Sequence, residues 1–111
     1  DLYLIVQRNR NKHLGLKWEF PGGKVQFNET FEEALLREIK EELNFTIKVH
    51  RKITEEKYTD DKIEIVLHYY LCSQESGTLK LTEHENFVWV EKKDFGKYDF
   101  AEGDGNMLSL L

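Results

Sequence analysis

The spacing of apolar and polar positions predicts one amphipathic helix, which begins after Thr30 and ends near Leu43. At about 100° per residue, the apolar residues of this segment fall on one stripe. Thr30 and Glu33, three positions later, form the pattern of a capping box, which is typical of a helix N-terminus. Asn44 follows the last apolar residue, and asparagine is second only to glycine in the left-handed conformation that ends many helices. The stripe consists of Phe31, Leu35, Leu36, Ile39 and Leu43.

Short apolar or alternating runs predict strands on both sides of this helix. Residues 59–62 are a predicted turn, so the flanking runs 55–58 and 63–65 are expected to form a hairpin. Residues 73–77 are expected to be a loop, and a terminal helix is expected to begin at Asn106. Strand-rich segments with a central and a terminal helix predict an α+β fold. The predicted strands span 2–6, 17–20, 45–58 (one or two strands with an irregular middle), 63–72 and 87–90, with a further short strand beginning at 78–81 and a helical turn at 92–95.

The composition is that of an ordinary globular domain, with 40% hydrophobic and 33% charged residues in 111 positions. This length predicts a single domain over residues 1–111. The net charge of −5 argues against a sequence-independent grip on a nucleic acid polymer, which needs a basic surface. Cys72 is the only cysteine and is expected to pack in a strand, so we expect a reducing, cytoplasmic location. No apolar run approaches the ~20 residues of a membrane span.

Three glutamates lie beside the apolar stripe of the predicted helix. Glu38, Glu41 and Glu42 border it, whereas Glu33 and Arg37 point away from it. Carboxylates three and four positions apart repel one another, and crowding them beside a buried face costs more free energy unless a cation compensates. Hard divalent cations such as Mg²⁺ take oxygen ligands of this kind. The pattern therefore predicts a helix that holds a metal ion.

The segment from Gly23 to Phe45 resembles the Nudix box, G-x5-E-x7-R-E-U-x-E-E-x-G-U, in which U is a bulky aliphatic or aromatic residue. Every position fits except the late glycine, which is Asn44 here. This departure is mild, because asparagine tolerates the left-handed conformation better than other non-glycine residues. Outside the box the chain is similar to the MutT-type branch, the proteins that resemble 8-oxo-dGTP diphosphatase and CTP pyrophosphohydrolase. The segments that carry this second likeness are 17–24 (KWEFPGGK), Glu83-His84 and 98–104 (YDFAEGD).

The resemblance implies the fold and the site residues. The fold would be an α/β/α sandwich with a mixed sheet between helices and a catalytic loop-helix-loop, and an additional strand would precede Asp1. Glu38, Glu41 and Glu42 would hold Mg²⁺, or Mn²⁺ in its place, with the Gly22 carbonyl as a further ligand. Glu83 would be another ligand or the general base, unless it is a solvated loop residue. Arg37 with Glu29 and Gly23 would orient the box, and Arg8 and Lys24 would contact substrate phosphates.

The base of the nucleotide is expected between the sheet and the C-terminal segment. Asp104 is either a residue that bonds to the edge of the base or the N-cap of the last helix. Phe20, Tyr69 or Tyr70 either stacks on the base or packs in the core. The four histidines show no metal spacing and are expected to be surface or packing residues.

The reaction implied by the resemblance is the attack of water on a phosphorus of a nucleoside diphosphate linked to a further group, with Glu38 or Glu83 taking the proton. The first hypothesis is a nucleoside triphosphate diphosphatase that hydrolyses oxidised or non-standard (d)NTPs to the monophosphate and pyrophosphate. The second is a Nudix hydrolase of a dinucleoside polyphosphate or a nucleotide sugar. The third is a non-catalytic nucleotide-sensing module, against which the intact set of three helix glutamates argues. The expected partner is the nucleotide alone, without a membrane, and the protein is expected to be a monomer or a homodimer.

Overall fold

The computed structural model describes residues 2–62, 64–105 and 107–111. Helix α1 spans Phe31–Leu43, as the apolar stripe predicts. The capping box is confirmed, because Thr30 N–H donates to Glu33 Oε1 at 2.8 Å and Glu33 N–H donates to Thr30 Oγ1 at 3.1 Å. Asn44 ends the helix in the left-handed conformation, at φ 63° and ψ 29°. Local sequence signals therefore fix both ends of this helix.

Three short strands form an antiparallel sheet in the order β2-β1-β5. Strand β1 spans Tyr3–Gln7, β2 spans Trp18–Glu19 and β5 spans Asn86–Val90. All three were expected from their apolar runs. The sheet brings the first and last strands of the chain together, since β1 pairs along its whole length with β5.

The other two strands form a long antiparallel hairpin. Strand β3 spans Phe45–Thr59 and β4 spans Glu64–Gly77, with three register shifts along β3. These shifts lie between Thr46 and Thr54, and they are the irregularity expected in the middle of this strand. The expected loop at 73–77 is wrong, because these polar residues pair with 45–48 and so belong to β4. Residues 78–81 form no strand, and instead Lys80 N–H donates to the Leu43 carbonyl at the end of α1, at 2.9 Å.

The C-terminal part is helical but short. It contains the 3₁₀ helix η1 at Lys92–Lys97, helix α2 at Glu102–Gly105 and the 3₁₀ helix η2 at Leu108–Leu110. The expected start of a terminal helix at Asn106 falls outside the described residues, and a single 3₁₀ turn follows it. Asp104 lies inside α2, so it does not cap a later helix.

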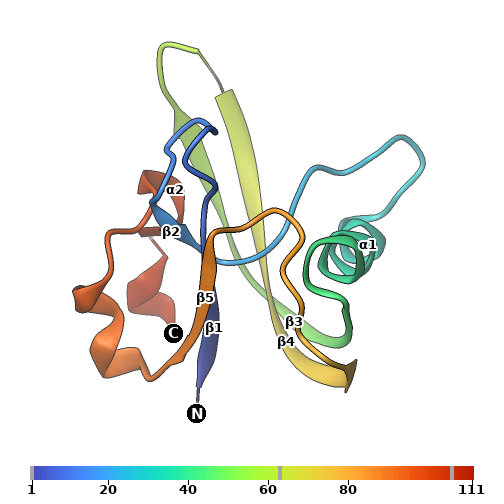
Figure 1. Ribbon diagram of the computed structural model, residues 1–111. Helices are drawn as coiled ribbons and strands as arrows, with labels where there is room; N and C mark the ends of the chain where they lie inside the picture. Colours follow the sequence, from blue (N-terminus) through green and yellow to red (C-terminus); the bar gives the residue numbers. More distant parts are fainter. Residues whose placement is uncertain (1, 63, 106) are drawn as a thin grey trace.

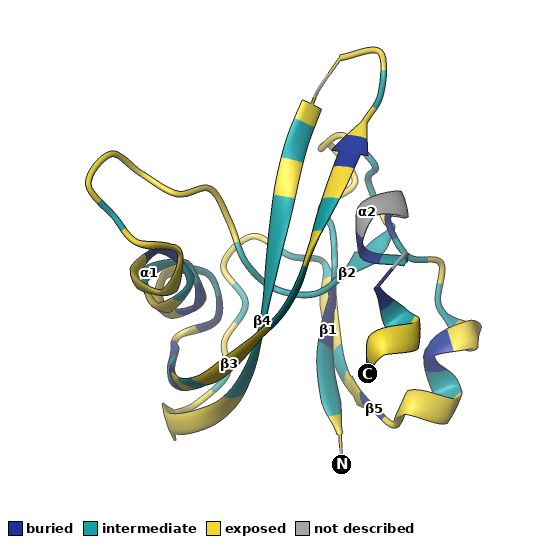
Figure 2. Ribbon diagram, turned by 180° about the vertical axis from the view of Figure 1, so that it is seen from behind, coloured by how far each residue is buried: buried dark blue, intermediate teal, exposed yellow. Residues whose placement is uncertain are grey.

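The elements are layered around β1. Helix α1 packs on one side of the strands and the C-terminal helical segments lie on the other (Figure 1). The α+β class is confirmed, although the resemblance implied one mixed sheet: the described strands form two antiparallel sheets, and the parallel pairing is a single bridge between Trp18 and Phe100. Figure 2 shows the buried residues along the inner side of α1 and in the middle of β1. No helix among the described residues is long and apolar enough to cross a membrane.

Candidate active site

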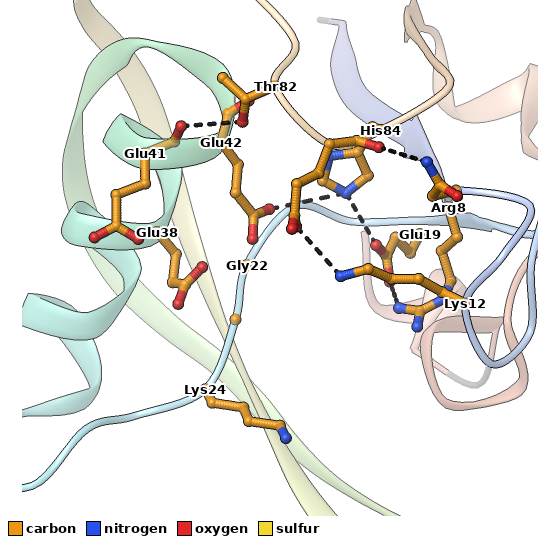
Figure 3. A pocket seen from close by; sticks show the side chains of 13 residues that line it. Arg8, Lys12, Glu19, Gly22, Lys24, Glu38, Glu41, Glu42, Thr82 and His84 are labelled. Atoms are coloured by element: carbon orange, nitrogen blue, oxygen red, sulfur yellow. Dashed lines mark hydrogen bonds and ion pairs between the residues drawn. The ribbon is translucent and has the colours of Figure 1, made fainter.

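Residues from α1, from the loop after β1, from β2 and the segment that follows it, and from the loop before β5 surround one cavity of about 580 Å³ (Figure 3). Its lining is rich in charged groups of both signs. The acidic residues are Glu19, Glu38, Glu41, Glu42 and Glu83, and the basic residues are Arg8, Lys12, Lys24 and His84. We call it the acidic cavity.

The glutamates of α1 differ in exposure. The side chains of Glu38 and Glu42 are only 15% and 16% exposed, whereas that of Glu41 is 59% exposed. Burial, followed by the neighbouring Glu38 carboxylate, raises the pKa of Glu42 to about 8. A part-buried carboxylate whose ionisation is opposed by a neighbouring carboxylate is the situation in which a cation is stabilising.

The donor set therefore fits a hard divalent cation, which takes carboxylate and carbonyl oxygens. In the part of the chain that the structure describes, no three histidine, cysteine or carboxylate side chains are close enough together to hold an ion as they stand. Binding would thus require the carboxylates of the acidic cavity to turn toward the ion. Glutamate side chains with three rotatable bonds can make that adjustment.

Two glycines shape the wall opposite α1. A Cβ on Gly23 would lie only 2.3 Å from the Glu38 carboxyl carbon, so any other residue there would displace the Glu38 side chain or the backbone. A Cβ on Gly22 would meet a Leu35 methyl at 3.7 Å, an ordinary contact. The segment after β2 can therefore pass this close to Glu38, with the Glu38 carboxyl group in its present position, because residue 23 lacks a side chain.

Arg37 ties this segment to α1. Its guanidinium donates to Glu29 at 2.7 and 2.9 Å, to Glu38 at 2.8 Å and to the Lys24 carbonyl at 2.9 Å. The hydrogen bonds between Arg37 and Glu29 stabilise the charged form of both groups. They raise the pKa of Arg37 and lower the pKa of Glu29. The expected ion pair is thus present, and its role in orienting Glu38 stays a prediction.

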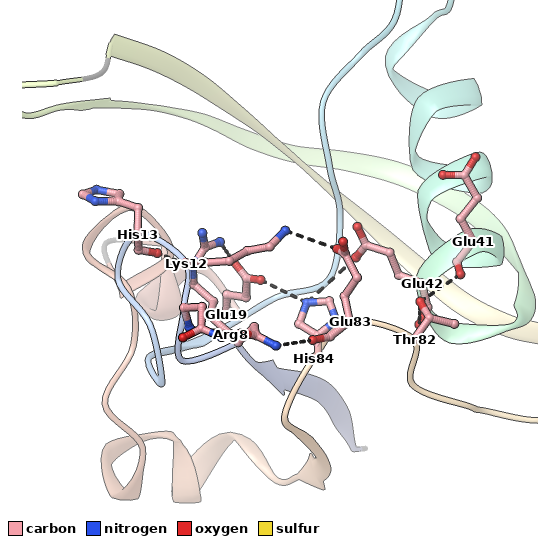
Figure 4. Close-up of polar contacts among 11 residues, drawn as sticks. Arg8, Lys12, His13, Glu19, Glu41, Glu42, Thr82, Glu83 and His84 are labelled. Atoms are coloured by element: carbon pink, nitrogen blue, oxygen red, sulfur yellow. Dashed lines mark hydrogen bonds and ion pairs between the residues drawn. The ribbon is translucent and has the colours of Figure 1, made fainter.

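The loop before β5 places Glu83 and His84 in the wall of the acidic cavity, where they face α1. The Glu83 side chain is 52% exposed, and its Oε2 accepts from Lys12 Nζ at 3.3 Å. His84 is 7% exposed, with Nε2 at 3.2 Å from Glu19 Oε2 and 3.8 Å from Glu42 Oε2 (Figure 4). Its buried Nδ1 has no hydrogen-bond partner among the described residues.

Sequence reasoning missed two members of this network. His84 is buried, in agreement with the expectation that the four histidines are surface or packing residues, but that expectation did not include its position between two carboxylates. Glu19 was not singled out either, yet it also accepts from Arg8 Nη1 at 2.8 Å. In the sequence, His84 lies next to Glu83, and Glu19 lies just before the Pro21-Gly22-Gly23 segment. These positions place both residues near the predicted site, but they do not show which side chains the two residues contact.

The residues expected near the base line a second, larger and mainly apolar cavity of about 1260 Å³. Phe20, Tyr69, Tyr70 and Asp104 are among its lining. Asp104 is buried and accepts from Phe20 N–H at 2.7 Å and from the Tyr69 hydroxyl. Burial raises the pKa of Asp104 to about 6, against the effect of these two hydrogen bonds. Asp104 thus connects the segment after β2, strand β4 and helix α2 in the wall of the larger cavity.

The two cavities are adjacent, because five residues line both. These are Arg8, Glu19, Gly22, Gly23 and Lys24. Two of them are cations and one is the carboxylate of Glu19, which is paired with Arg8, so the junction between the carboxylate-rich chamber and the apolar one carries both signs of charge, with Lys24 as its second cation.

Comparison with known families matches the sequence of residues 2–111 to the NUDIX domain. The chain belongs to the NUDIX family. This Nudix hydrolase is 32% identical over 108 residues to the CTP pyrophosphohydrolase of Escherichia coli, covering 97% of this chain and 80% of that protein. It is 30% identical over 110 residues to the 8-oxo-dGTP diphosphatase of Buchnera aphidicola, covering 99% and 82% of the two chains.

The fold agrees with the sequence match. The solution structure of the Escherichia coli ORF135 protein superposes with a TM-score of 0.85 at 30% identity, over 98% of this chain and 78% of that one. The protein is therefore a Nudix hydrolase of MutT type, an enzyme of the class that acts on phosphoric anhydride bonds. The MutT-type resemblance of the sequence is confirmed.

Proposed function

We propose that this Nudix hydrolase is a Mg²⁺-dependent nucleoside triphosphate diphosphatase that hydrolyses oxidised or non-standard (d)NTPs to the monophosphate and pyrophosphate. The observation that carries the proposal is the continuity of the two cavities. A triphosphate fits the carboxylate-rich chamber once a cation is bound, and a base fits the adjacent apolar chamber lined by Phe20, Tyr69 and Tyr70.

Each residue of the acidic cavity takes a role in this proposal. Glu38, Glu41, Glu42 and Glu83, with the Gly22 carbonyl, would hold Mg²⁺, or Mn²⁺ in its place. When bound, the ion offsets the charge of the phosphoryl oxygens and lowers the pKa of water. Glu38 or Glu83 accepts the proton of the attacking water. Arg37, held by Glu29, fixes the Glu38 carboxylate for this task.

The cations at the junction bind the phosphates. Arg8 is already aligned by its hydrogen bond to Glu19, and Lys24 lies on the opposite segment of the wall. Both side chains face a polyphosphate that passes from one cavity to the other. Asp104 is the proposed contact for the base edge, and base recognition there requires exchange of one of its two present hydrogen bonds. The chemistry of its carboxyl does not choose among bases.

The names of the relatives support the same class. One is called a CTP pyrophosphohydrolase and another an 8-oxo-dGTP diphosphatase, and both cover more than nine tenths of this chain. The substrate is thus proposed to be a free nucleotide and not a nucleic acid polymer, in keeping with the net charge of −5. We propose a cytoplasmic monomer or homodimer, and the single cysteine is consistent with a reducing compartment.

The test is a hydrolysis screen with Mg²⁺ over oxidised, methylated and ordinary nucleoside triphosphates, dinucleoside polyphosphates and nucleotide sugars, with the products identified. Monophosphate and pyrophosphate from one or a few triphosphates are expected. Preferred turnover of a dinucleoside polyphosphate or nucleotide sugar would replace the proposal by that substrate class. Tight nucleotide binding without turnover of any substrate would indicate a sensing module.

The helix carboxylates are tested by Glu42→Gln. Because the amide cannot supply a charged oxygen, kcat is expected to fall by at least about 100-fold, the scale on which a preorganised charge acts on phosphoryl chemistry. The far-UV circular dichroism spectrum should be unchanged. Glu32→Gln is the matched control, since Glu32 is an exposed glutamate of α1 outside the acidic cavity. Near-normal kcat in Glu42→Gln would refute the assignment of these carboxylates to the metal.

A further inference from the structure

The segment 82–85, which carries Glu83 and His84, is anchored at both of its ends. At the first end, Thr82 is bonded to the C-terminal carbonyls of α1. Its N–H donates to the Glu42 carbonyl at 3.1 Å, and its hydroxyl donates to the carbonyls of Glu41 and Glu42 at 3.1 and 3.3 Å. These acceptors belong to the last turn of the helix, where carbonyls lack helical partners. Thr82 thus fixes the segment to the same residues whose side chains line the acidic cavity.

At the second end, Glu85 is bonded to the loop after β1. Its N–H donates to the Gln7 carbonyl at 2.9 Å. Its carboxylate accepts from Arg10 through the backbone N–H at 3.2 Å, Nε at 3.1 Å and Nη2 at 3.4 Å. A guanidinium fork that contacts both carboxylate oxygens restricts direction as well as distance.

Arg10 and Glu85 act from outside the site. Neither lines the acidic cavity, and the Arg10 side chain is 68% exposed. Their contact spans 75 positions of sequence and is supported by Asn9, whose amide donates to the Glu83 carbonyl at 3.3 Å. Only two residues, Glu83 and His84, lie between the two anchors. A segment this short has little conformational freedom once both ends are held, because the anchors already restrict the backbone of the two residues between them.

We propose that Arg10 is a positioning residue: through Glu85 it holds the segment 82–85 so that Glu83 faces α1 across the acidic cavity. The proposal rests on the proposed function, because it assigns Glu83 to the cation-binding set. Loss of the Arg10 guanidinium leaves Thr82 bonded to α1 and the Glu85 N–H bonded to the Gln7 carbonyl, but it removes the fork that fixes the Glu85 carboxylate and so lets the Glu83 side chain sample directions away from the cavity. Cation affinity then falls although no cavity residue has changed.

The first experiment measures the segment without a metal or substrate. Hydrogen–deuterium exchange is compared in wild type, Arg10→Ala, Glu85→Gln and Arg51→Ala, an exposed arginine of β3 that serves as the matched control. We expect several-fold faster exchange over residues 83–86 in the first two variants, and unchanged exchange in α1 and in Arg51→Ala. Wild-type exchange of 83–86 in Arg10→Ala would overturn the proposal.

The second experiment measures Mn²⁺ binding by electron paramagnetic resonance in the same proteins without nucleotide. Arg10→Ala is expected to weaken Mn²⁺ binding by about tenfold, the effect of removing a group that orients a ligand. Arg10→Lys should recover part of the loss, because lysine keeps the charge but not the fork. Adding Arg10→Ala to Glu83→Gln should cause no further loss, since the ligand it positions is already gone.

The two levels of failure are distinct. Absence of Mn²⁺ binding and turnover in the wild type would remove the proposed function, and the positioning role with it. Wild-type binding and turnover together with an unchanged Mn²⁺ affinity in Arg10→Ala would overturn the positioning role alone. So would an equal further loss when Arg10→Ala is added to Glu83→Gln, because Arg10 would then act by another route.

Discussion

Gly23 and Gly22 are adjacent, and the structure assigns them different constraints. Because a Cβ at position 23 would overlap the Glu38 carboxyl group, Gly23→Ala must displace either Glu38 or the segment after β2. We expect a large loss of kcat with Gly23→Ala, and near-normal kcat with Gly22→Ala, whose added methyl has room and whose carbonyl is unchanged. Steady-state hydrolysis by the two variants checks this. Equal activity of the two variants would show that the close approach at Gly23 is unnecessary.

Asp104 is expected to make stability depend on pH. Burial raises its pKa to about 6 in the folded protein, from an ordinary value of 3.8. The folded state therefore keeps this proton where the unfolded chain has lost it, and stability contributed by Asp104 falls as pH rises from about 4 to about 6. The change amounts to up to about 3 kcal/mol.

The measurement is the free energy of unfolding in urea for wild type and Asp104→Asn across this pH range. Relative to Asp104→Asn, the wild type should lose stability as the pH rises. Asp61→Asn, at an exposed aspartate in the hairpin turn, should show no such trend. A difference between wild type and Asp104→Asn that stays constant with pH would contradict the prediction.

Among the elements, α1 carries the clearest test of a local signal. Asn44 holds the left-handed conformation at its end, and its side-chain amide donates to the Thr78 carbonyl at 3.1 Å. Asn44→Ala is expected to destabilise the fold by about 1–2 kcal/mol, because a β-carbon is disfavoured there. Asn44→Gly loses the same hydrogen bond, but glycine adopts the left-handed conformation without the steric cost of a β-carbon. Its free energy of unfolding should remain within about 1 kcal/mol of wild type.

Both variants lack the amide, so the difference between their urea unfolding free energies isolates the backbone effect. Equal destabilisation would mean that the hydrogen bond to Thr78 matters and the conformation does not. Asn44→Gly would also restore the residue that the Nudix box has at this position, so its kcat should stay close to that of the wild type.

At the scale of the whole molecule, β1 joins the two halves of the core. Val6 is fully buried with Ile39, Leu43 and Phe45 on the side of α1. Ile5, its neighbour, is fully buried on the opposite side with Val90 and Phe95. Because consecutive strand residues point to opposite faces, one short strand supports both clusters.

Removing either side chain should therefore weaken the entire fold. Ile5→Ala is expected to cost about 2–5 kcal/mol, and Val6→Ala somewhat less because fewer atoms are removed. Unfolding followed by tryptophan fluorescence and by far-UV circular dichroism should coincide in both variants. Leu2→Ala, at a position 58% exposed, is the control and should change little. Separate transitions for the two probes would show that the two halves unfold independently.

Most of the elements could be predicted from the sequence because their signals are local. The stripe, the capping box and Asn44 lie within fifteen consecutive residues, and each acts on its own neighbours. Strand limits were harder to predict: residues 73–77 have no apolar pattern and are held in β4 by pairing with residues 45–48. A polar run of this kind is a loop or a strand according to its partner, which local sequence does not contain.

The sequence by itself determined the helix, the family and the carboxylates that α1 presents, since spacing along one helix already places them on one face. Only the tertiary structure decided which distant groups meet them. Glu19 and His84 are 65 positions apart yet within 3.2 Å, and Arg10 reaches Glu85 across 75. Such contacts depend on chain packing and on the burial that comes with it, which also raises the pKa of Glu42. A side chain's partner is set by the fold, whereas its chemical type is set by the sequence.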